Sequence, residues 1–419
     1  MREMKGSGIE WIGQIPKGWE LRRAKTLFTQ RNSKGNGIEV LLSPTQKYGV
    51  VPQSQLEGVV QVKEDTDLQM FKTVHKGDFV ISLRSFQGGF EYSLYEGVCS
   101  PAYQVFYPTS PICDTYYRYL FKSQSFISKM NNLTVGIREG KNIQYVDFAN
   151  SQIPVPPLAE QERIAAFLDA ECAEIDAVLE KTRASIEEYK KLKQAVITQA
   201  VTKGIRGDRP MKDSGIEWIG DIPAEWDVVR IKNLFDYRNE RNFKPLEEVN
   251  LISLYTDKGV VQHCDLDETT GNKASNADGY KLVYENDIVV NIILCWMGAI
   301  GRSAYFGVTS PAYDVYSPKQ KTNSKFYHYL FRTNGFSGDC YKVGRGIMAM
   351  RWRTYSDQFR AIKVVSPPQS EQEEIVEYLD EKCEGIDALI AKKQQYLTEI
   401  ENYKKSLIYE YVTGKKEVV

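Results

Sequence analysis

The sequence predicts an α/β (mixed α+β) protein: two globular domains with mostly β cores, separated by a pair of long antiparallel coiled-coil helices with pseudo-two-fold symmetry. Three observations predict this fold. One long unit occurs twice, short strand-like runs fill the first part of each copy, and a heptad pattern fills the rest. The chain has 419 residues, 42% hydrophobic and 26% charged, as in ordinary globular proteins, and its length suffices for two or three domains.

The repeat is clearest near the start of the sequence. The segment 4–19 returns as 211–226 with twelve of sixteen residues identical. Weaker matches follow in the same order, including Gly97–Tyr103 with Gly307–Tyr313. A repeating unit of about half the chain is far longer than a solenoid repeat, so the pattern indicates a duplicated domain.

Short β-branched or aromatic runs, bounded by Gly, Pro or Ser, predict strands in each copy. The predicted strands are 39–42, 78–83 and 102–107 in the first copy, and 250–254, 287–294 and 312–316 in the second. Two aromatic-rich segments, 115–123 and 324–333, predict short helices. The patterns leave the strand order open.

After each Pro-Pro pair, at 156–157 and 367–368, apolar residues recur at alternating intervals of four and three. This spacing is typical of a coiled coil. The predicted seam residues are Leu168, Cys172, Ile175, Leu179, Ile186, Tyr189 and Val196, then Leu379, Cys383, Ile386, Ile390, Leu397, Ile400 and Leu407. Pairing buries both seams, and an antiparallel pair gives a closed two-fold arrangement. A seam of roughly 32 residues would be a rigid spacer of about 50 Å.

Composition narrows the function classes. A net charge of −1 gives no overall attraction to nucleic acid or membrane. We expect no secretion signal, and the most apolar stretch, 288–300, is too short to span a bilayer. Seven cysteines without a C-x-x-C pair favour buried thiols in a reducing cytoplasm. The three histidines lie outside any zinc pattern, so no metal site is expected.

Catalytic motifs are missing where they would be expected. The Pro-Pro pairs lack the flanking residues of an amino-methyltransferase motif, and no phosphate-binding glycine loop precedes a helix. Glu139-Gly140-Lys141 resembles half of a nuclease motif but has no counterpart in the second copy. Cys172 and Cys383 lie on the predicted seam, where packing explains them. The sequence therefore predicts no catalytic residues and no cofactor in this chain.

The remaining candidates are polar and aromatic loop residues that differ between the copies while the frame is kept. Arg, Lys, Gln and Asn donate hydrogen bonds to bases and phosphates. For any single residue plain solvent exposure is the more frequent explanation, so the divergence of whole loops carries the argument. The candidate DNA-binding residues are Gln46, Lys47, Tyr48, Arg84, Ser85, Phe86, Gln87, Arg138, Lys141 and Asn142, then Tyr255, Thr256, Lys258, Trp296, Met297, Arg345, Arg351 and Arg353.

Three duplicated motifs occur in one order: Gly-Ile-Glu-Trp-Ile-Gly-x-Ile-Pro, Ser-Pro-Ala-Tyr, and Pro-Pro-x-x-Glu-Gln-Glu-x-Ile before a heptad helix. Over essentially its whole length the chain resembles the specificity (S) subunit of type I restriction–modification systems. The resemblance implies a first target-recognition domain at 1–155, a central conserved helix at 156–206, a second recognition domain at 207–366 and a C-terminal conserved helix at 367–419.

The resemblance also implies a function. Each recognition domain would read one half of an asymmetric bipartite site in double-stranded DNA, and the coiled coil would set the spacing. Two methyltransferase (M) subunits and the restriction (R) subunits would supply catalysis, with S-adenosylmethionine, ATP and Mg bound there, in a cytoplasmic complex without a membrane. We expect the chain alone to bind DNA weakly.

Three points stay open at this stage. The residues Glu160, Gln161, Glu371 and Gln372 are either M-subunit surface or ordinary helix N-terminal residues favoured by the helix dipole. One alternative function is a duplicated coiled-coil adaptor that binds no DNA. Another is the recognition part of a fused modification enzyme.

Overall fold

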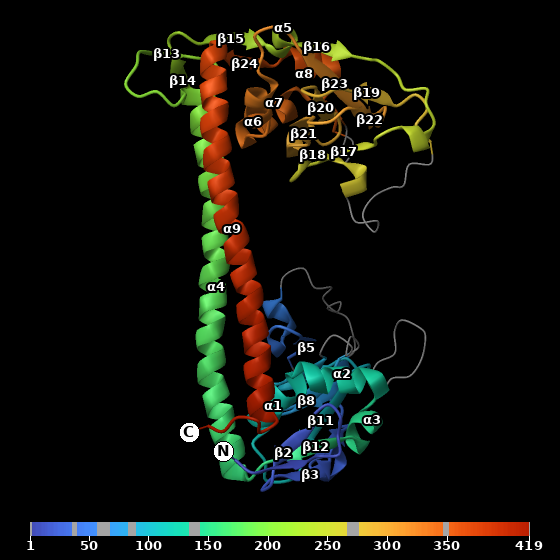
Figure 1. Ribbon diagram of the computed structural model, residues 1–419. Helices are drawn as coiled ribbons and strands as arrows, with labels where there is room; N and C mark the ends of the chain where they lie inside the picture. The colour runs from blue at the N-terminus through green and yellow to red at the C-terminus, as the bar shows by residue number, and fades with distance from the viewer. Residues whose placement is uncertain are drawn as a thin grey trace. The chain divides into compact units, whose positions relative to one another are not determined.

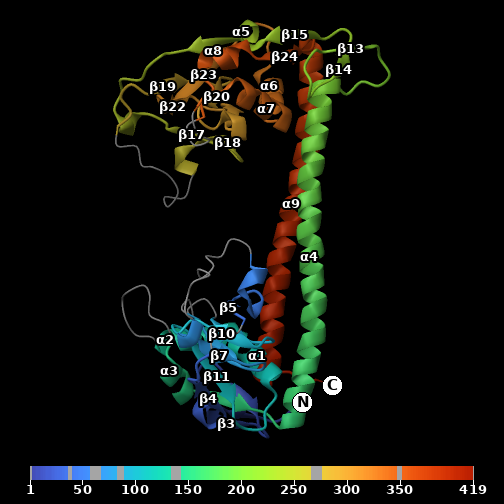
Figure 2. The ribbon, with the colours of Figure 1, turned by 180° about the vertical axis from the view of Figure 1, so that it is seen from behind.

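The structure, a computed structural model, describes residues 2–35, 40–56, 68–82, 89–133, 143–265, 276–346 and 352–418. The chain forms two compact units (Figures 1 and 2). Unit 1 comprises Met1–Arg183 and Gln394–Val419, and unit 2 comprises Ala184–Lys393. Each unit holds one globular head and part of both long helices. The predicted mixed α/β fold with two globular domains and paired long helices is confirmed.

Unit 1 has a four-stranded antiparallel sheet in the order β4-β11-β8-β9, with four two-stranded pairs around it: β1-β2, β12-β3, β10-β7 and β5-β6. The strands are β1 (Met4–Gly6), β2 (Gln14–Pro16), β3 (Glu20–Arg23), β4 (Phe28–Arg31), β5 (Leu42–Thr45), β6 (Gly49–Pro52), β7 (Lys72–Val74), β8 (Phe79–Ile81), β9 (Phe90–Tyr92), β10 (Gly97–Cys99), β11 (Gln104–Pro108) and β12 (Gln152–Val155). The short helices are α1 (Asp114–Lys122), α2 (Gln124–Leu133) and α3 (Tyr145–Asn150).

Unit 2 repeats this topology, with the sheet order β16-β23-β20-β21 and the pairs β13-β14, β15-β24, β19-β22 and β17-β18. The strands are β13 (Met211–Asp213), β14 (Asp221–Pro223), β15 (Asp227–Arg230), β16 (Phe235–Arg238), β17 (Ile252–Tyr255), β18 (Gly259–Gln262), β19 (Lys281–Val283), β20 (Ile288–Asn291), β21 (Ile300–Arg302), β22 (Gly307–Thr309), β23 (Tyr313–Pro318) and β24 (Lys363–Ser366). The short helices are α5 (Ile231–Leu234), α6 (Ser324–Phe331), α7 (Asn334–Val343) and α8 (Ser356–Ala361).

All six predicted strands overlap observed ones, though 39–42 does so only at Leu42, and both predicted short helices form, as α1 and α6. The predicted strand 39–42 is observed shifted toward the C-terminus: residue 39 lies outside the described residues, Leu41 forms a bridge with Val98, and β5 begins at Leu42. Segment 43–45, which lies beyond the predicted strand, belongs to β5 and pairs with β6. A proline is acceptable at position 44 because β5 belongs to a two-stranded pair, where the main-chain N–H that proline lacks is not needed on the unpaired side.

The alternating direction of side chains along β8 explains where the β5–β6 hairpin of unit 1 packs. Successive side chains of a strand point to opposite faces of the sheet. In β8, Phe79 and Ile81 join the large aromatic core beneath the short helices, while Val80 joins a smaller cluster with Leu42 of β5 and Val50 of β6. The hairpin is therefore held against the second face of the sheet by its own apolar residues.

The same alternation operates in unit 2. Ile288 and Val290 of β20 enter the large core, whereas Val289 packs with Ile252 and Leu254 of β17 in the smaller cluster. The hairpin β17–β18 thus occupies the place that β5–β6 has in unit 1. Its turn, 256–258, and the turn 46–48 of unit 1 are equivalent positions in the repeat.

The long helices are α4 (Leu158–Lys203) and α9 (Gln369–Val412). They pair antiparallel within each unit. In unit 1, Lys404 pairs with Asp176 and Arg183 with Glu401; in unit 2, Lys193 pairs with Asp387, and Arg206, three residues after α4, pairs with Glu374. The fourteen predicted seam residues are all buried or half-buried.

A glycine with a left-handed backbone follows each long helix: Gly204, with φ 74°, directly after α4, and Gly414, with φ 70°, two residues after the end of α9. A side chain would be strained in this conformation, and glycine there closes the last turn of the helix. Both helices are thus followed by the same kind of turn, although the two glycines differ by one position in the repeat.

Candidate nucleic-acid interface

The first turn of each long helix is locked into its own head by a buried carboxylate. Glu160 of α4 accepts a hydrogen bond from the Trp19 indole N–H at 2.9 Å and pairs with Arg2 at 2.6 Å. Glu371 of α9 does the same with Trp226 at 2.9 Å and Arg209 at 2.6 Å. A buried carboxylate is retained only when it is paired and hydrogen-bonded. This duplicated group attaches helix to head.

The neighbouring glutamines complete the attachment. Gln161 accepts from the main-chain N–H of Cys113 at 2.9 Å, and Gln372 accepts from that of Asn323 at 2.8 Å. Glu160, Gln161, Glu371 and Gln372 are all buried. Their interpretation as partner-binding surface is therefore wrong, because the heads already cover them. Sequence reasoning missed the arginines, which lie far away in the chain.

In unit 2 the structure brings two predicted segments together, the turn after Tyr255 and the short 3-10 turn Cys295–Met297. The guanidinium of Arg332, which follows α6, donates to the carbonyl oxygens of Thr256 at 2.9 Å and Asp257 at 2.8 Å. It also donates to the carbonyl oxygen of Gly298 at 3.4 Å. Thr256, Lys258 and Met297 are exposed, so one arginine holds two solvent-facing segments against each other.

An aromatic ladder lies beside these segments. The rings of Trp296 and Tyr341 have centroids 5.6 Å apart, and Tyr341 stacks on Trp352 at 5.0 Å with an interplanar angle of 24°. Tyr341 is 50% exposed and Met297 53%. Exposed aromatic side chains stack on the bases of single strands, and in duplex DNA an apolar side chain can contact thymine methyl groups in the major groove. Tyr341 and Trp352 were missed, because nothing in their local spacing distinguishes them from core aromatics.

Two predicted arginines flank the ladder. Arg345 and Arg353 form a main-chain bridge, with N–H to O distances of 2.8 and 3.0 Å. Thr354, fully buried, ties this bridge to the 3-10 turn, because its N–H donates to the carbonyl of Ile292 at 2.8 Å. Arg351 lies outside the described residues. The described candidates of unit 2 thus share one connected surface.

In unit 1 the predicted residues Gln46, Lys47 and Tyr48 form the exposed turn of the β5–β6 hairpin. The hydroxyl of Thr45 accepts from the Tyr48 N–H at 3.0 Å and donates to the carbonyl of Gly49 at 3.0 Å. The Lys47 ammonium lies 4.8 Å from the centre of the Tyr48 ring, which is 60% exposed. The turn offers a cation, an amide and an aromatic face to a ligand. Lying outside the described residues are Arg84, Ser85, Phe86, Gln87, Arg138, Lys141 and Asn142.

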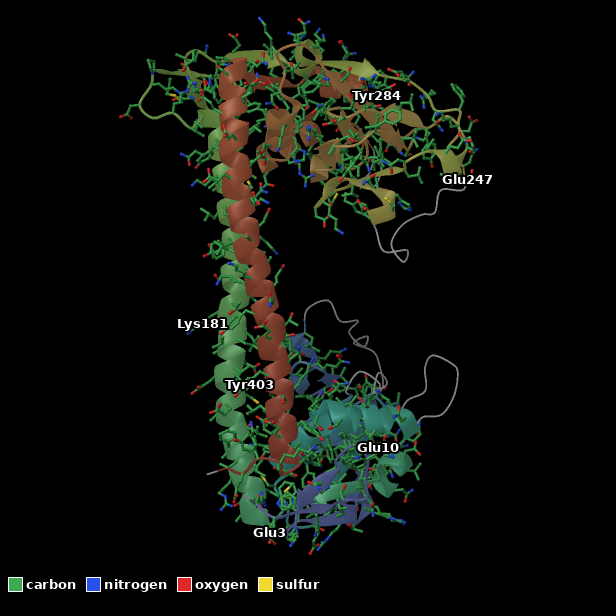
Figure 3. All side chains as sticks on the ribbon, in the orientation of Figure 1. Glu3, Glu10, Lys181, Glu247, Tyr284 and Tyr403 are labelled. Atoms are coloured by element: carbon green, nitrogen blue, oxygen red, sulfur yellow. The ribbon has the colours of Figure 1, made fainter. Side chains whose placement is uncertain are left out.

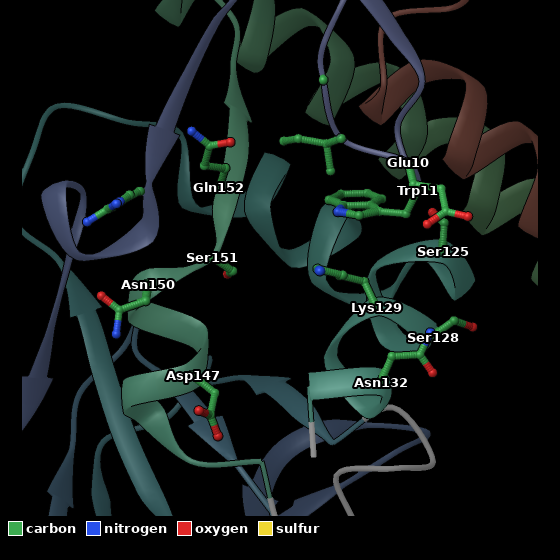
Figure 4. A pocket seen from close by; sticks show the side chains of 13 residues that line it. Glu10, Trp11, Ser125, Ser128, Lys129, Asn132, Asp147, Asn150, Ser151 and Gln152 are labelled. Carbon is green, nitrogen blue, oxygen red and sulfur yellow. The ribbon is translucent and has the colours of Figure 1, made fainter. Parts of the chain in front are cut away.

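Unit 1 also contains an open pocket of about 960 Å³ between α2 and the α3–β12 segment (Figure 4). Trp11 closes one end, and Lys129 faces Asp147 and Asn150 across it. Its ionisable side chains are two acids, Glu10 and Asp147, and two bases, Arg23 and Lys129. A lining without excess positive charge does not favour a phosphate backbone. We do not assign this pocket to DNA.

The equivalent place in unit 2 is packed differently. The Trp218 indole lies directly on Gly335, where any side chain would collide with it, and donates to Asp339 at 2.6 Å. Unit 1 has Ser125 and Lys129 at the corresponding positions, and Trp11 there packs edge-on against Phe126 at 5.7 Å. The copies therefore differ inside the heads as well as in the turns.

Within the described parts of the chain, no group of three His, Cys, Asp or Glu side chains is placed to hold a metal ion. The helices of that same portion include none that is sufficiently long and apolar to cross a membrane. Cys172 and Cys383 of the long helices are free thiols buried among apolar side chains, and burial raises the pKa of both.

Comparisons with known proteins agree with this geometry. The family model of the type I restriction modification DNA specificity domain matches residues 16–188 and again 223–401. Two relatives come from Methanocaldococcus jannaschii. The type I restriction enzyme MjaVIII specificity subunit is 27% identical over 300 residues, which are 67% of this chain and 66% of that protein. The putative type I restriction enzyme MjaX specificity subunit is 25% identical over 442 residues, 97% of this chain and 96% of that one.

Two solved structures share the fold. A chain from a type I R-M system aligns with a TM-score of 0.70 at 15% identity, over 96% of this chain and 99% of that chain. The HsdS subunit from Thermoanaerobacter tengcongensis aligns with a TM-score of 0.52 at 15% identity, over 96% and 98%. At this identity the likeness concerns the fold alone.

Proposed function

Because the chain belongs to the family of the type I restriction modification DNA specificity domain, which it contains twice, we propose that it is a non-catalytic subunit that reads an asymmetric bipartite site in double-stranded DNA. Each head reads one half-site. The observation that carries this proposal is the pairing of one conserved frame with two different exposed surfaces at the equivalent hairpins, 46–48 and 256–258.

The residue types on these surfaces suit base and phosphate contacts. Unit 2 presents Lys258, Arg345 and Arg353 around an aromatic ladder, and unit 1 presents Gln46, Lys47 and Tyr48. Arginine, lysine and glutamine donate to guanine, adenine and phosphate acceptors in the grooves. Because the equivalent turn positions 46–48 and 256–258 carry a different residue at every position, the two half-sites should differ in sequence.

We propose that the paired helices set the half-site spacing and bind two methyltransferase subunits. Large apolar side chains are exposed at equivalent positions outside the seam: Val178 and Tyr403 in unit 1, Leu192 and Leu389 in unit 2. Val178 corresponds to Leu389, and Leu192 to Tyr403, in the repeat. Exposed apolar side chains in a shared pattern favour a protein partner. The near-neutral charge of the chain fits partners that supply the phosphate contacts.

The function is tested by expressing the full chain with an M subunit encoded beside it and mapping methylated adenines in the host DNA. The proposal predicts one two-part motif with unlike halves. Methylation independent of this chain, or a motif with a single undivided element, would contradict it. Restriction would additionally require R subunits, with S-adenosylmethionine, ATP and Mg bound by the partners.

Partner binding is tested separately through the helices. Val178→Glu with Tyr403→Glu should weaken M-subunit binding at least tenfold in pull-down titrations, since two charges enter an apolar contact. The matched control is Lys181→Glu, on an exposed side chain of the same helix; Lys181 and Tyr403 are both labelled in Figure 3. Equal effects of both changes would contradict the assigned surface. Retained M binding without any methylated motif would instead favour an adaptor that binds no DNA.

A further inference from the structure

Arg332 connects two exposed segments of unit 2 that are about forty residues apart in the chain. Its Nη2 donates to the carbonyl oxygens of Thr256 and Asp257 at 2.9 and 2.8 Å, and its Nη1 to those of Ile300 and Gly298 at 3.1 and 3.4 Å. A planar guanidinium can address four oxygens at fixed angles, which an ammonium cannot. The side chain therefore fixes the relative placement of turn 256–258 and loop 296–298.

Two glycines make this contact possible. Gly259 has φ 72°, and a Cβ there would lie 3.3 Å from the Arg332 Nη1. A Cβ on Gly301 would lie 3.2 Å from the main-chain nitrogen of Val260, so β18 and β21 approach closely only without it. One turn earlier on α6, the His328 Nδ1 accepts the main-chain N–H of Arg302 at 3.1 Å. The C-terminal part of α6 thus sets the position of both segments.

Unit 1 uses the same positions differently. Lys122 stands where unit 2 has Arg332, and Glu91 stands where unit 2 has Gly301. The Lys122 ammonium pairs with Glu91 at 2.6 Å, and Glu91 is fully buried in the sheet. The cation at the C-terminal end of the short helix therefore binds a carboxylate within the sheet in unit 1, and the turn carbonyls in unit 2. The two units therefore differ at both positions: Lys122 and Glu91 in unit 1 correspond to Arg332 and Gly301 in unit 2.

We propose that Arg332 is a positioning residue for DNA reading by unit 2. By fixing turn 256–258 against loop 296–298, it determines which bases the second recognition domain accepts. This inference rests on the proposed function, since it assumes that these two segments contact the half-site. Arg332 itself acts through the main chain of Thr256, Asp257 and Gly298 and need not touch DNA.

The first test maps adenine methylation by the full chain and its M subunit with Arg332→Gln and Arg332→Lys. Arg332→Gln should lower the discrimination between the cognate half-site of unit 2 and single-base variants of it at least tenfold, with the half-site of unit 1 unchanged. Arg332→Lys should restore little of this discrimination, because an ammonium lacks the planar set of N–H donors of the guanidinium. The control is Lys325→Gln on the same helix, which removes a cation paired with Asp380 and should leave both half-sites unchanged. An unaltered motif, or equal relaxation of both half-sites, would overturn the proposal.

The second test needs no DNA. Hydrogen exchange of the purified full chain should show amides of 255–259 and 296–300 exchanging at least tenfold faster in Arg332→Gln, with Val289 and Val315 of the sheet unchanged. No acceleration would overturn the positioning role even if unit 2 reads DNA. If the wild-type chain directs no methylation of a two-part motif, the proposed function fails, and so does the role of Arg332 in DNA reading. The hydrogen-exchange measurement still decides whether Arg332 holds the two segments together.

Discussion

The two heads are built on one frame but differ where the frame meets solvent. At the helix attachment they are alike: the indole N–H to carboxylate distance is 2.9 Å in both, Trp19 to Glu160 and Trp226 to Glu371. At the equivalent hairpin turns they share no residue besides the closing glycines, Gly49 and Gly259. The difference teaches that the helix attachment lies in the shared part of the repeat and the proposed DNA reading in the part that differs, so one can change while the other is kept.

The largest expected effect concerns the shared part. Glu160→Ala and Glu371→Ala should each destabilise their own unit by about 3–5 kcal/mol, since each leaves a buried indole N–H without its acceptor and a half-buried arginine without this carboxylate. Arg209 keeps a second pair, with Glu225, so the loss in unit 2 should be the smaller of the two. Unit-resolved hydrogen exchange in denaturant measures this. Glu377→Ala, an exposed residue of α9, is the control and should change stability by less than about 0.5 kcal/mol. A large effect in one unit only would break the equivalence of the two attachments.

The second prediction concerns a part that differs, the buried Glu91 of unit 1. Burial raises the pKa of Glu91 from 4.5 to about 7, against the opposing effect of Lys122. Between these pH values the unfolded chain releases the proton while the folded chain keeps it, so stability falls as pH rises from 4.5 to 7. The loss attributable to Glu91 amounts to at most about 3 kcal/mol.

Unfolding of unit 1 followed across this pH window measures the effect. Glu91→Gln should remove the dependence that Glu91 contributes and leave unit 2, which has Gly301 at this position, unaffected. An unchanged pH profile in the variant would show that the carboxyl titrates as it does in the unfolded chain.

The third prediction compares the two reading surfaces. Tyr341→Ala and Tyr48→Ala each remove an exposed aromatic side chain, and truncation of an anchoring aromatic at a specific interface costs about 2 kcal/mol, roughly thirtyfold in affinity. Each should weaken binding by the chain–M complex only to DNA carrying the half-site of its own unit, in titrations against DNA with either half-site scrambled. Indistinguishable effects on both half-sites would contradict the assignment of one surface to each half.

The smallest expected effect lies in the helices. Lys404–Asp176 and Lys193–Asp387 are equivalent ion pairs, both at 2.6 Å, with largely exposed aspartates. Exposed pairs contribute about 0.2–1 kcal/mol each. Asp176→Asn and Asp387→Asn should therefore lower the local stability of their units equally and slightly, and less so in high salt. A loss above about 2 kcal/mol in either would mean that the pair is more than a surface contact.

Much of the frame could be predicted, because repetition and periodicity are local in the sequence. The duplicated motifs predicted the two heads, and the heptad spacing predicted seam residues such as Leu179 and Ile386, which are both buried in the structure. The mixed α/β class followed from the same patterns. Strand order did not, since pairings such as β12 with β3 join residues more than a hundred positions apart.

The functional surface was harder to predict for the same reason. Glu160 and Glu371 have the position of ordinary helix N-terminal acids, and their partners Arg2 and Arg209 come from distant segments. In the sequence Arg332 is an ordinary basic residue at the end of a predicted helix. Only the fold brings it to the carbonyl oxygens of Thr256 and Asp257. The candidate base-contacting residues remain predictions from residue type and loop position.

The central claim is that each head reads one half of the site independently. Its most direct test replaces residues 207–366 with the corresponding domain of another family member, keeps both long helices, and maps adenine methylation with the same M subunit. The account predicts a motif in which one half changes to the donor's sequence while the other half and the spacing stay as in the wild type. An unchanged motif, or a change in both halves, would contradict it.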